Sequence, residues 1–162
     1  MSFRNRVAFV CIAIPALVEL GLGVAYFTAS EVMSYHQEAL GVGWSQLEPR
    51  VRTLLITLLN GYGSAHFAVG IALSALLLFP LRQGQAWARW AVLAIGLPVL
   101  GATAYLSARL AAVTGSNVPW QGAVILLLLF LVGVALVDPR AAAQPVDAPD
   151  RQQPASPPVG DR

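Results

Sequence analysis

Two ionisable side chains, Glu19 and His66, lie inside long apolar stretches of the chain. Lipid has no water to solvate such groups, so in a membrane-spanning helix they are expected to face protein or a wet cavity. Glu19 lies about 18 Å of helix beyond Val7, and His66 lies about 21 Å before Pro80 on the next, antiparallel helix. These similar depths predict that the two side chains face each other, directly or through one water.

A carboxyl group beside an imidazole can hold and pass a proton, because burial favours the neutral acid while a neighbouring imidazolium favours the carboxylate. The alternative is a structural clamp between two helices. Such clamps contribute only about 0.6 kcal/mol on average, whereas a carboxylate at the centre of a lone helix costs about 2.5–3.5 kcal/mol. A functional pair, a clamp and a simply protonated Glu19 all stay open at this point.

Further polar side chains are candidates for extending a pocket from this pair toward the outer surface. They are Asn60, Tyr62, Tyr26 and Tyr105. Tyr62 lies one helical turn before His66 and therefore on the same face. The competing interpretation for the tyrosines is an ordinary position at the membrane interface, where this residue type is enriched.

The sequence predicts neither a metal site nor a cofactor. His36, Glu38 and Glu31 supply at most three ligands on a loop, whereas a structural zinc site needs four. Glycine-rich phosphate loops, nucleophile elbows and paired-histidine motifs are all missing from the sequence. All ten basic residues are arginine, which excludes Schiff-base and Walker-lysine chemistry, and they are scattered rather than gathered into a nucleic-acid patch. The single cysteine, Cys11, excludes an intrachain disulfide framework.

The composition is that of a membrane protein. Of the 162 residues, 57% are hydrophobic and 11% are charged, against roughly 25% charged in an average soluble domain. Residues 7–28, 54–81, 86–112 and 120–137 are long and apolar enough to span a bilayer. Because the later connections are short, the sequence predicts an all-α membrane protein, with residues 1–137 folded as a four-transmembrane-helix up-down bundle.

The segments around these spans are expected to be irregular or peripheral. Residues 30–48 predict a short extracytoplasmic interfacial helix and a loop broken at Gly41 and Gly43. Ser45 and Glu48 have the spacing of a capping box, which predicts that the second long helix begins near Gln46. Residues 138–162 hold six of the eleven prolines and four of the eight acids. This Pro-rich tail is predicted to be disordered.

Packing and orientation follow from small and basic residues. Ser64, Ala68 and Ala72 form a stripe at four-residue spacing, which predicts close approach of a neighbouring helix or of a second copy. With four spans both termini share one side. That side carries seven arginines against three on the other, namely Arg4, Arg6, Arg82, Arg89, Arg140, Arg151 and Arg162 against Arg50, Arg52 and Arg109. This bias predicts cytoplasmic N- and C-termini in the cell membrane.

Several short segments carry a resemblance to known proteins: Tyr35-His36, Gly41, Trp44, Pro80-Leu81-Arg82-Gln83-Gly84 and Trp87-Ala88-Arg89-Trp90-Ala91. In them the chain resembles small uncharacterised four-helix bacterial inner-membrane proteins, loosely DoxX-like. The resemblance implies a bacterial cytoplasmic-membrane protein of unassigned role. DoxX-like proteins are associated with quinone-linked or thiol redox systems, but no motif here carries one of their functional residues, and one cysteine argues against a thiol role.

These observations favour an integral membrane protein that is an accessory or small-ligand-binding component with Glu19 and His66 as its buried polar centre. The expected partners are the lipid bilayer, a lipophilic small molecule and another membrane protein, and no nucleic acid. The alternative is a membrane enzyme or proton-coupled carrier that uses the pair as acid and base on a lipophilic substrate such as a quinone. An enzyme or carrier needs a cavity that reaches the pair from lipid or water, whereas a clamp should be closed around it.

Overall fold

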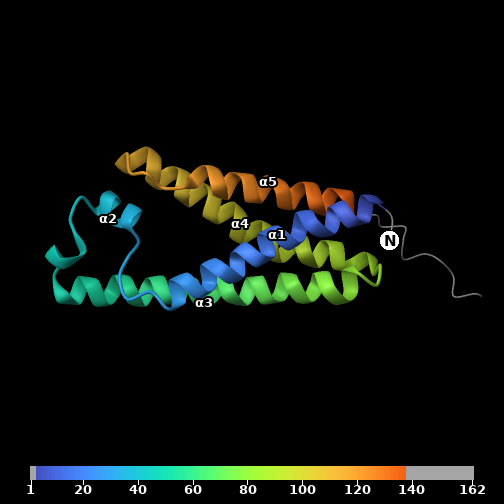
Figure 1. The fold of residues 1–162 in the computed structure, drawn as a ribbon, viewed down its shortest axis with the longest axis horizontal. Coiled ribbons are helices and arrows are strands. Elements are labelled where there is room, and N and C mark those ends of the chain that lie inside the picture. The colour runs from blue at the N-terminus through green and yellow to red at the C-terminus, as the bar shows by residue number, and fades with distance from the viewer. Residues whose placement is uncertain (1–2, 138–162) are drawn as a thin grey trace, which may run out of the picture.

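The computed structural model describes residues 3–137, which fold into helices without any β-strand among them (Figure 1). The elements are α1 (Phe3–Phe27), α2 (Ser34–Leu40), the 3-10 turn η1 (Trp44–Gln46), α3 (Pro49–Leu76), the π-helical turn η2 (Leu77–Leu81), α4 (Ala86–Thr114) and α5 (Trp120–Leu136). The predicted all-α fold is confirmed for this part of the chain. The predicted tail, residues 138–162, lies outside the described residues.

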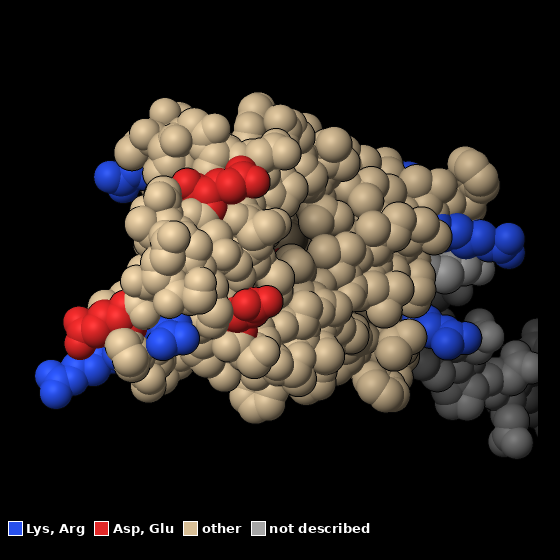
Figure 2. Space-filling model, turned by 60° about the vertical axis from the view of Figure 1, so that its left-hand side comes forward, with Lys and Arg blue, Asp and Glu red and all other residues tan. Residues whose placement is uncertain are grey.

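Three of the helices are long and apolar enough to cross a membrane. They are α1, the continuous helix Pro49–Leu81 made of α3 and η2, and α4, with 25, 33 and 29 residues. The fourth long helix, α5, is apolar but has 17 residues. On the face shown in Figure 2, charged side chains gather toward the two ends and leave an uncharged belt between them. These features are those of a membrane protein.

The four long helices run in alternating directions along the long axis of the molecule (Figure 1). Helix α1 packs mainly against α3 and α5, and α4 packs against the same two helices. The start of α1 and the end of α5 lie at one end, where Arg4 Nε donates a hydrogen bond to the Leu136 carbonyl at 2.9 Å. Helix α2 lies at the opposite end.

The closest packing in the molecule, between α1 and α3, depends on glycine. A Cβ atom on Gly23 would lie 2.5 Å from the backbone nitrogen of Phe67, and one on Gly63 would lie 2.8 Å from the backbone carbonyl carbon of Tyr26. Gly70 meets Leu20 in the same way, at 2.7 Å. Helix backbones come this close only where no side chain separates them.

The predicted stripe of Ser64, Ala68 and Ala72 is therefore wrong as a contact with a neighbouring helix of this chain, while its alternative, contact with a second copy, stays a prediction. Ser64 and Ala68 are exposed, and Ala72 is half-buried. The buried face instead carries Gly63, His66 and Gly70, at alternating spacings of three and four residues. These positions share one side of a helix, and glycine permits a closer approach than alanine or serine.

The predicted start of the second long helix also needs correction. Gln46 belongs to the separate turn η1, where its Oε1 accepts a hydrogen bond from the Gly43 backbone nitrogen at 3.2 Å, and Glu48 makes no capping hydrogen bond to α3. Helix α3 begins at Pro49, because the fixed φ of proline suits a first turn and its missing N–H has no partner to lose there. The predicted short helix is confirmed as α2, and it ends at Gly41 with a left-handed φ of 70°.

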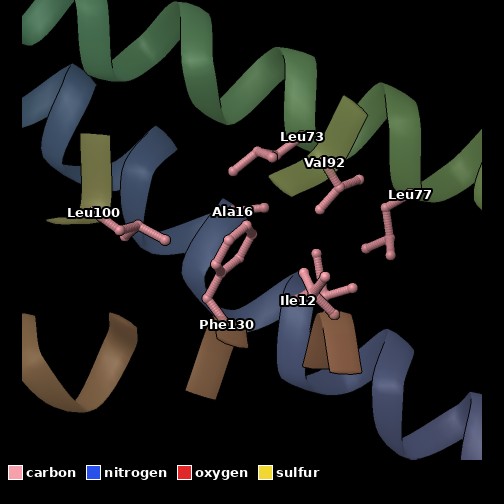
Figure 3. Packing of buried hydrophobic residues seen from close by; sticks show 8 residues of the cluster. Ile12, Ala16, Leu73, Leu77, Val92, Leu100 and Phe130 are labelled. Carbon is pink, nitrogen blue, oxygen red and sulfur yellow. The ribbon is translucent and has the colours of Figure 1, made fainter. Parts of the chain in front are cut away.

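A cluster of buried aliphatic side chains and one phenyl ring fills the half of the molecule nearest the N-terminus. Phe130 of α5 is fully buried, and its ring points toward Ala16 of α1 (Figure 3). Gly96 of α4 leaves room for that ring, because a Cβ atom there would overlap it. The other members are Ile12, Leu73, Leu77, Val92, Leu100 and Val134. This cluster holds the four long helices together beneath the polar centre.

The glycine contacts predict opposite effects for two neighbouring Gly→Ala substitutions. Gly63→Ala forces α1 away from α3, and we expect a loss of about 1–3 kcal/mol in the free energy of unfolding, as for overpacked cores. Gly61→Ala is the matched control, since a Cβ atom there meets no described atom within 4 Å. It should be neutral or stabilise the helix by up to about 1 kcal/mol. Detergent unfolding measures both, and equal stabilities for the two variants would contradict the close contact.

Candidate functional site

The structure brings Glu19 of α1 and His66 of α3 into direct contact. Glu19 Oε2 and His66 Nδ1 form a hydrogen bond, and both side chains are only 1% exposed. The two groups come from positions 47 residues apart in the chain. The facing arrangement expected from their depths is therefore present, and no bridging water is needed.

The pair meets because glycines flank it on both helices. Gly23 follows Glu19 by one turn on α1, and Gly63 and Gly70 lie one turn to either side of His66 on α3. All three bring backbone of one helix against the other. Because the backbones of α1 and α3 lie this close together, the Glu19 and His66 side chains are long enough to form a direct hydrogen bond.

A cavity of about 400 Å³ reaches the pair from the end of the molecule that carries α2. Its wall includes residues of all five α-helices and of the turn between α4 and α5. Aliphatic side chains form much of this wall. The polar members are Glu19, Tyr26, Tyr35, His36, Tyr62, His66, Thr103 and Ser107. Figure 2 shows a hollow in the uncharged belt on the face that it presents.

Two tyrosine rings stand beside the His66 imidazole. The Tyr62 ring is edge-on to it, with 4.2 Å between centroids, and the Tyr26 ring lies at 6.3 Å. Their hydroxyl groups are engaged elsewhere: Tyr62 with Thr103 Oγ1 at 3.1 Å, and Tyr26 with the Tyr35 hydroxyl at 2.5 Å. The two rings thus give the imidazole an aromatic surrounding while their polar ends tie α3 to α4 and α1 to α2.

Helix α2 covers one end of this cavity and is fastened at several points. Besides the Tyr26–Tyr35 contact, Glu38 Oε2 accepts a hydrogen bond from the Asn117 backbone nitrogen at 3.0 Å. Gln37 Oε1 accepts another from the Trp44 backbone nitrogen at 3.1 Å. A second hollow of about 350 Å³ between α2 and α3 shares His36 and Tyr62 with the first.

Two of the candidate pocket residues lie elsewhere. Asn60 does not line the cavity; its side-chain amide lies among the backbone carbonyls of Tyr26, Ala29 and Ile56, at 2.9–3.3 Å from the nitrogen, and so holds the end of α1 against α3. Tyr105 is 63% exposed and faces away from the cavity. It follows Thr103 by two residues, which is more than half a turn round the helix.

Sequence reasoning missed four of the polar residues that line the cavity. Thr103 and Ser107 are spaced by four residues in an apolar span, and that signal was available to find them. Tyr35 and His36 were placed on a solvated loop, because no sequence pattern shows that α2 folds back over the helix ends. Among residues 3–137, no group of three His, Cys, Asp or Glu side chains is placed to hold a metal ion.

The arrangement can share one proton between a carboxyl group and an imidazole that are shielded from bulk solvent. Glu19 engages Nδ1, so the second nitrogen, Nε2, is the atom left to act on anything else. A carboxylate that orients an imidazole in this way makes its other nitrogen a better hydrogen-bond acceptor or general base. Binding of a polar group and proton transfer are both within its chemistry.

We expect Glu19 and His66 to be energetically coupled. Glu19→Leu leaves the imidazole unpaired, His66→Leu leaves the carboxyl group unpaired, and the double variant removes both costs. The coupling free energy should be about 0.6–1.7 kcal/mol, the range of polar contacts between membrane helices. Unfolding in mixed micelles measures it. Ser64→Ala combined with Glu19→Leu is the control and should be additive, because Ser64 is exposed and donates to the Gly61 carbonyl.

The α2 cover should loosen in mild acid. Burial lowers the pKa of His36 below its ordinary value of 6.5, so the detached helix takes up a proton more readily than the docked one. Docking is therefore at full strength above pH 6.5 and weakens as the pH falls from there toward the lowered pKa. Hydrogen exchange of α2, corrected for intrinsic rates, should speed up between pH 7.5 and 5.5. The same pH profile in His36→Phe would contradict this assignment.

Comparison with known proteins adds no family to this description. No family model, curated protein or solved structure matches the chain. The function of the site is therefore argued from its own geometry, namely the buried pair, the aromatic rings beside it and the cavity that reaches it.

Proposed function

We propose that this chain is a four-span membrane protein that binds a lipophilic small molecule in the cavity beside Glu19 and His66. The single observation that carries the proposal is the reach of the cavity, which has the buried pair in its wall. The two side chains are themselves only 1% exposed, so they form part of the inner wall of the cavity without being open to solvent. The aliphatic and aromatic wall suits an apolar molecule, and the volume of about 400 Å³ is within the usual range for small-molecule sites.

The proposal includes α5 as the fourth span. Its 17 residues extend over about 26 Å, close to the thickness of a bilayer core and within the range of known spans. The end of the molecule where α1 begins carries four arginines, Arg4, Arg6, Arg82 and Arg89. Among residues 3–137, no Asp or Glu lies at this end. The positive-inside rule then makes this end cytoplasmic and puts α2 outside. The DoxX-like resemblance proposes the same location, a bacterial cytoplasmic membrane.

A membrane enzyme or proton-coupled carrier on a substrate such as a quinone is the second candidate. The observation that favours it is the orientation of the pair, since a carboxylate on Nδ1 prepares the other imidazole nitrogen for acid–base work. Ligand binding is the more economical proposal, because it needs only the cavity and the pair. Four helices are few for a carrier, and no inverted repeat is evident in the sequence.

Filling the cavity should release the bound molecule. Ala123 is half-buried in the cavity wall on α5, and Ala123→Phe places a ring there while Glu19 and His66 themselves stay unsubstituted. Ala102→Phe makes the same change at an exposed position of α4 outside the cavity. Mass spectrometry of solvent extracts should find one apolar molecule with the wild type and with Ala102→Phe, and at least tenfold less with Ala123→Phe. Identical extracts from all three proteins would contradict the proposed site.

A further inference from the structure

Among residues 3–137, two buried hydrogen-bonding atoms of residues in the cavity wall have no partner, His66 Nε2 and His36 Nδ1, and the first of them belongs to the pair with Glu19. His66 Nε2 is out of contact with solvent and has no hydrogen-bond partner among residues 3–137. Leaving such an atom unpaired costs about 1–3 kcal/mol. His66 is one of the residues that line the cavity, so a molecule bound there is a candidate partner for this atom.

The hydrogen bond from Glu19 determines whether His66 Nε2 acts as a hydrogen-bond donor or as an acceptor. The contact joins Glu19 Oε2 to His66 Nδ1. With the carboxyl group ionised, it accepts the hydrogen bond of Nδ1–H, which places the proton of a neutral imidazole on that nitrogen. Nε2 is then left with a lone pair and is an acceptor. A bound molecule must bring a donor to it.

The tyrosine hydroxyl groups nearest to His66 do not donate a hydrogen bond to Nε2. The hydroxyl groups of Tyr62 and Tyr26 are paired with Thr103 and Tyr35, and their rings stand beside the imidazole. Beside His66 Nε2 a ligand therefore meets aromatic rings and hydroxyl groups that are already paired, while His36 and Ser107 belong to other parts of the same wall. An anionic donor group is disfavoured, because it would lie near the Glu19 carboxylate.

We infer that the ligand is an uncharged apolar molecule with a hydroxyl group, and that this hydroxyl donates its hydrogen bond to His66 Nε2. The inference rests on the proposed function and adds the ligand's chemical class. Phenols and aliphatic alcohols share this chemistry. The apolar body of the molecule would occupy the aliphatic part of the wall on α4 and α5.

The test uses three probes of similar shape: 4-pentylphenol, its methyl ether 4-pentylanisole, and pentylbenzene. Their binding to the full chain in nanodiscs is measured by calorimetry, with empty nanodiscs as the partition control. Wild type should bind the phenol about five- to tenfold more tightly than either probe without a donor, the effect of one satisfied buried acceptor. His66→Phe should bind all three alike, because the apolar wall is kept and the acceptor is lost.

The outcomes separate this inference from the proposed function. Equal binding of the three probes to wild type would overturn the hydroxyl assignment and leave the lipophilic site intact. No binding of any probe, with Ala123→Phe and wild type indistinguishable, would overturn both.

A second readout does not depend on the folding of His66→Phe. His36 lines the same cavity, so His36→Phe is used, in which His66 is the one remaining imidazole of the two in the sequence. With ¹⁵N-histidine labelling, a signal typical of an unprotonated Nε2 should move on addition of 4-pentylphenol and stay in place with 4-pentylanisole. Movement with both probes, or with neither, would contradict the hydrogen bond.

Discussion

The close approach of α1 and α3 is the constraint on which the rest of the structure depends. It exists because Gly23, Gly63 and Gly70 remove the side chains that would keep the two backbones apart. Once the helices are this close, Glu19 and His66 satisfy each other, and the cost of an ionisable group at this depth is shared between them. The close packing of α1 against α3 thus allows the Glu19–His66 hydrogen bond to form, and this hydrogen bond in turn helps to hold the two helices together.

The two halves of the molecule differ in how the space between the helices is used. Toward the N-terminal end, the Phe130 ring and aliphatic side chains fill the space between the helices. Gly96 leaves room for the ring because it has no side chain. Toward the α2 end, α5 contributes Gly122, Ala123 and Leu126 to the wall of the cavity, and two of these three residues have small side chains or none. The packed half fixes the positions of helices whose other ends remain apart, so the cavity does not depend on a ligand to hold it open.

The sequence predicted what depends on periodicity and depth, and failed where tertiary contacts decide. The long helices follow from apolar length, and the meeting of Glu19 with His66 follows from counting residues along antiparallel helices. The stripe of Ser64 and Ala68 does not face α1, whereas Gly63 and Gly70 do, because spacing alone does not tell which side of a helix a neighbouring helix contacts. Tyr35 and His36 were missed for a related reason: nothing local in residues 30–48 shows that they fold back over the cavity.

The contacts that hold α2 in place affect how fast a bound molecule could leave the cavity, as well as the structure itself. The helix is held to α1 through Tyr35, and to the turn between α4 and α5 through Glu38. A molecule that leaves past this helix has to wait until both contacts are broken together. The lifetime of an occupied cavity would then be set by the opening rate of the cover, and substitutions at Tyr35 or Glu38 would change dissociation rates without changing the chemical preference set deep inside by His66.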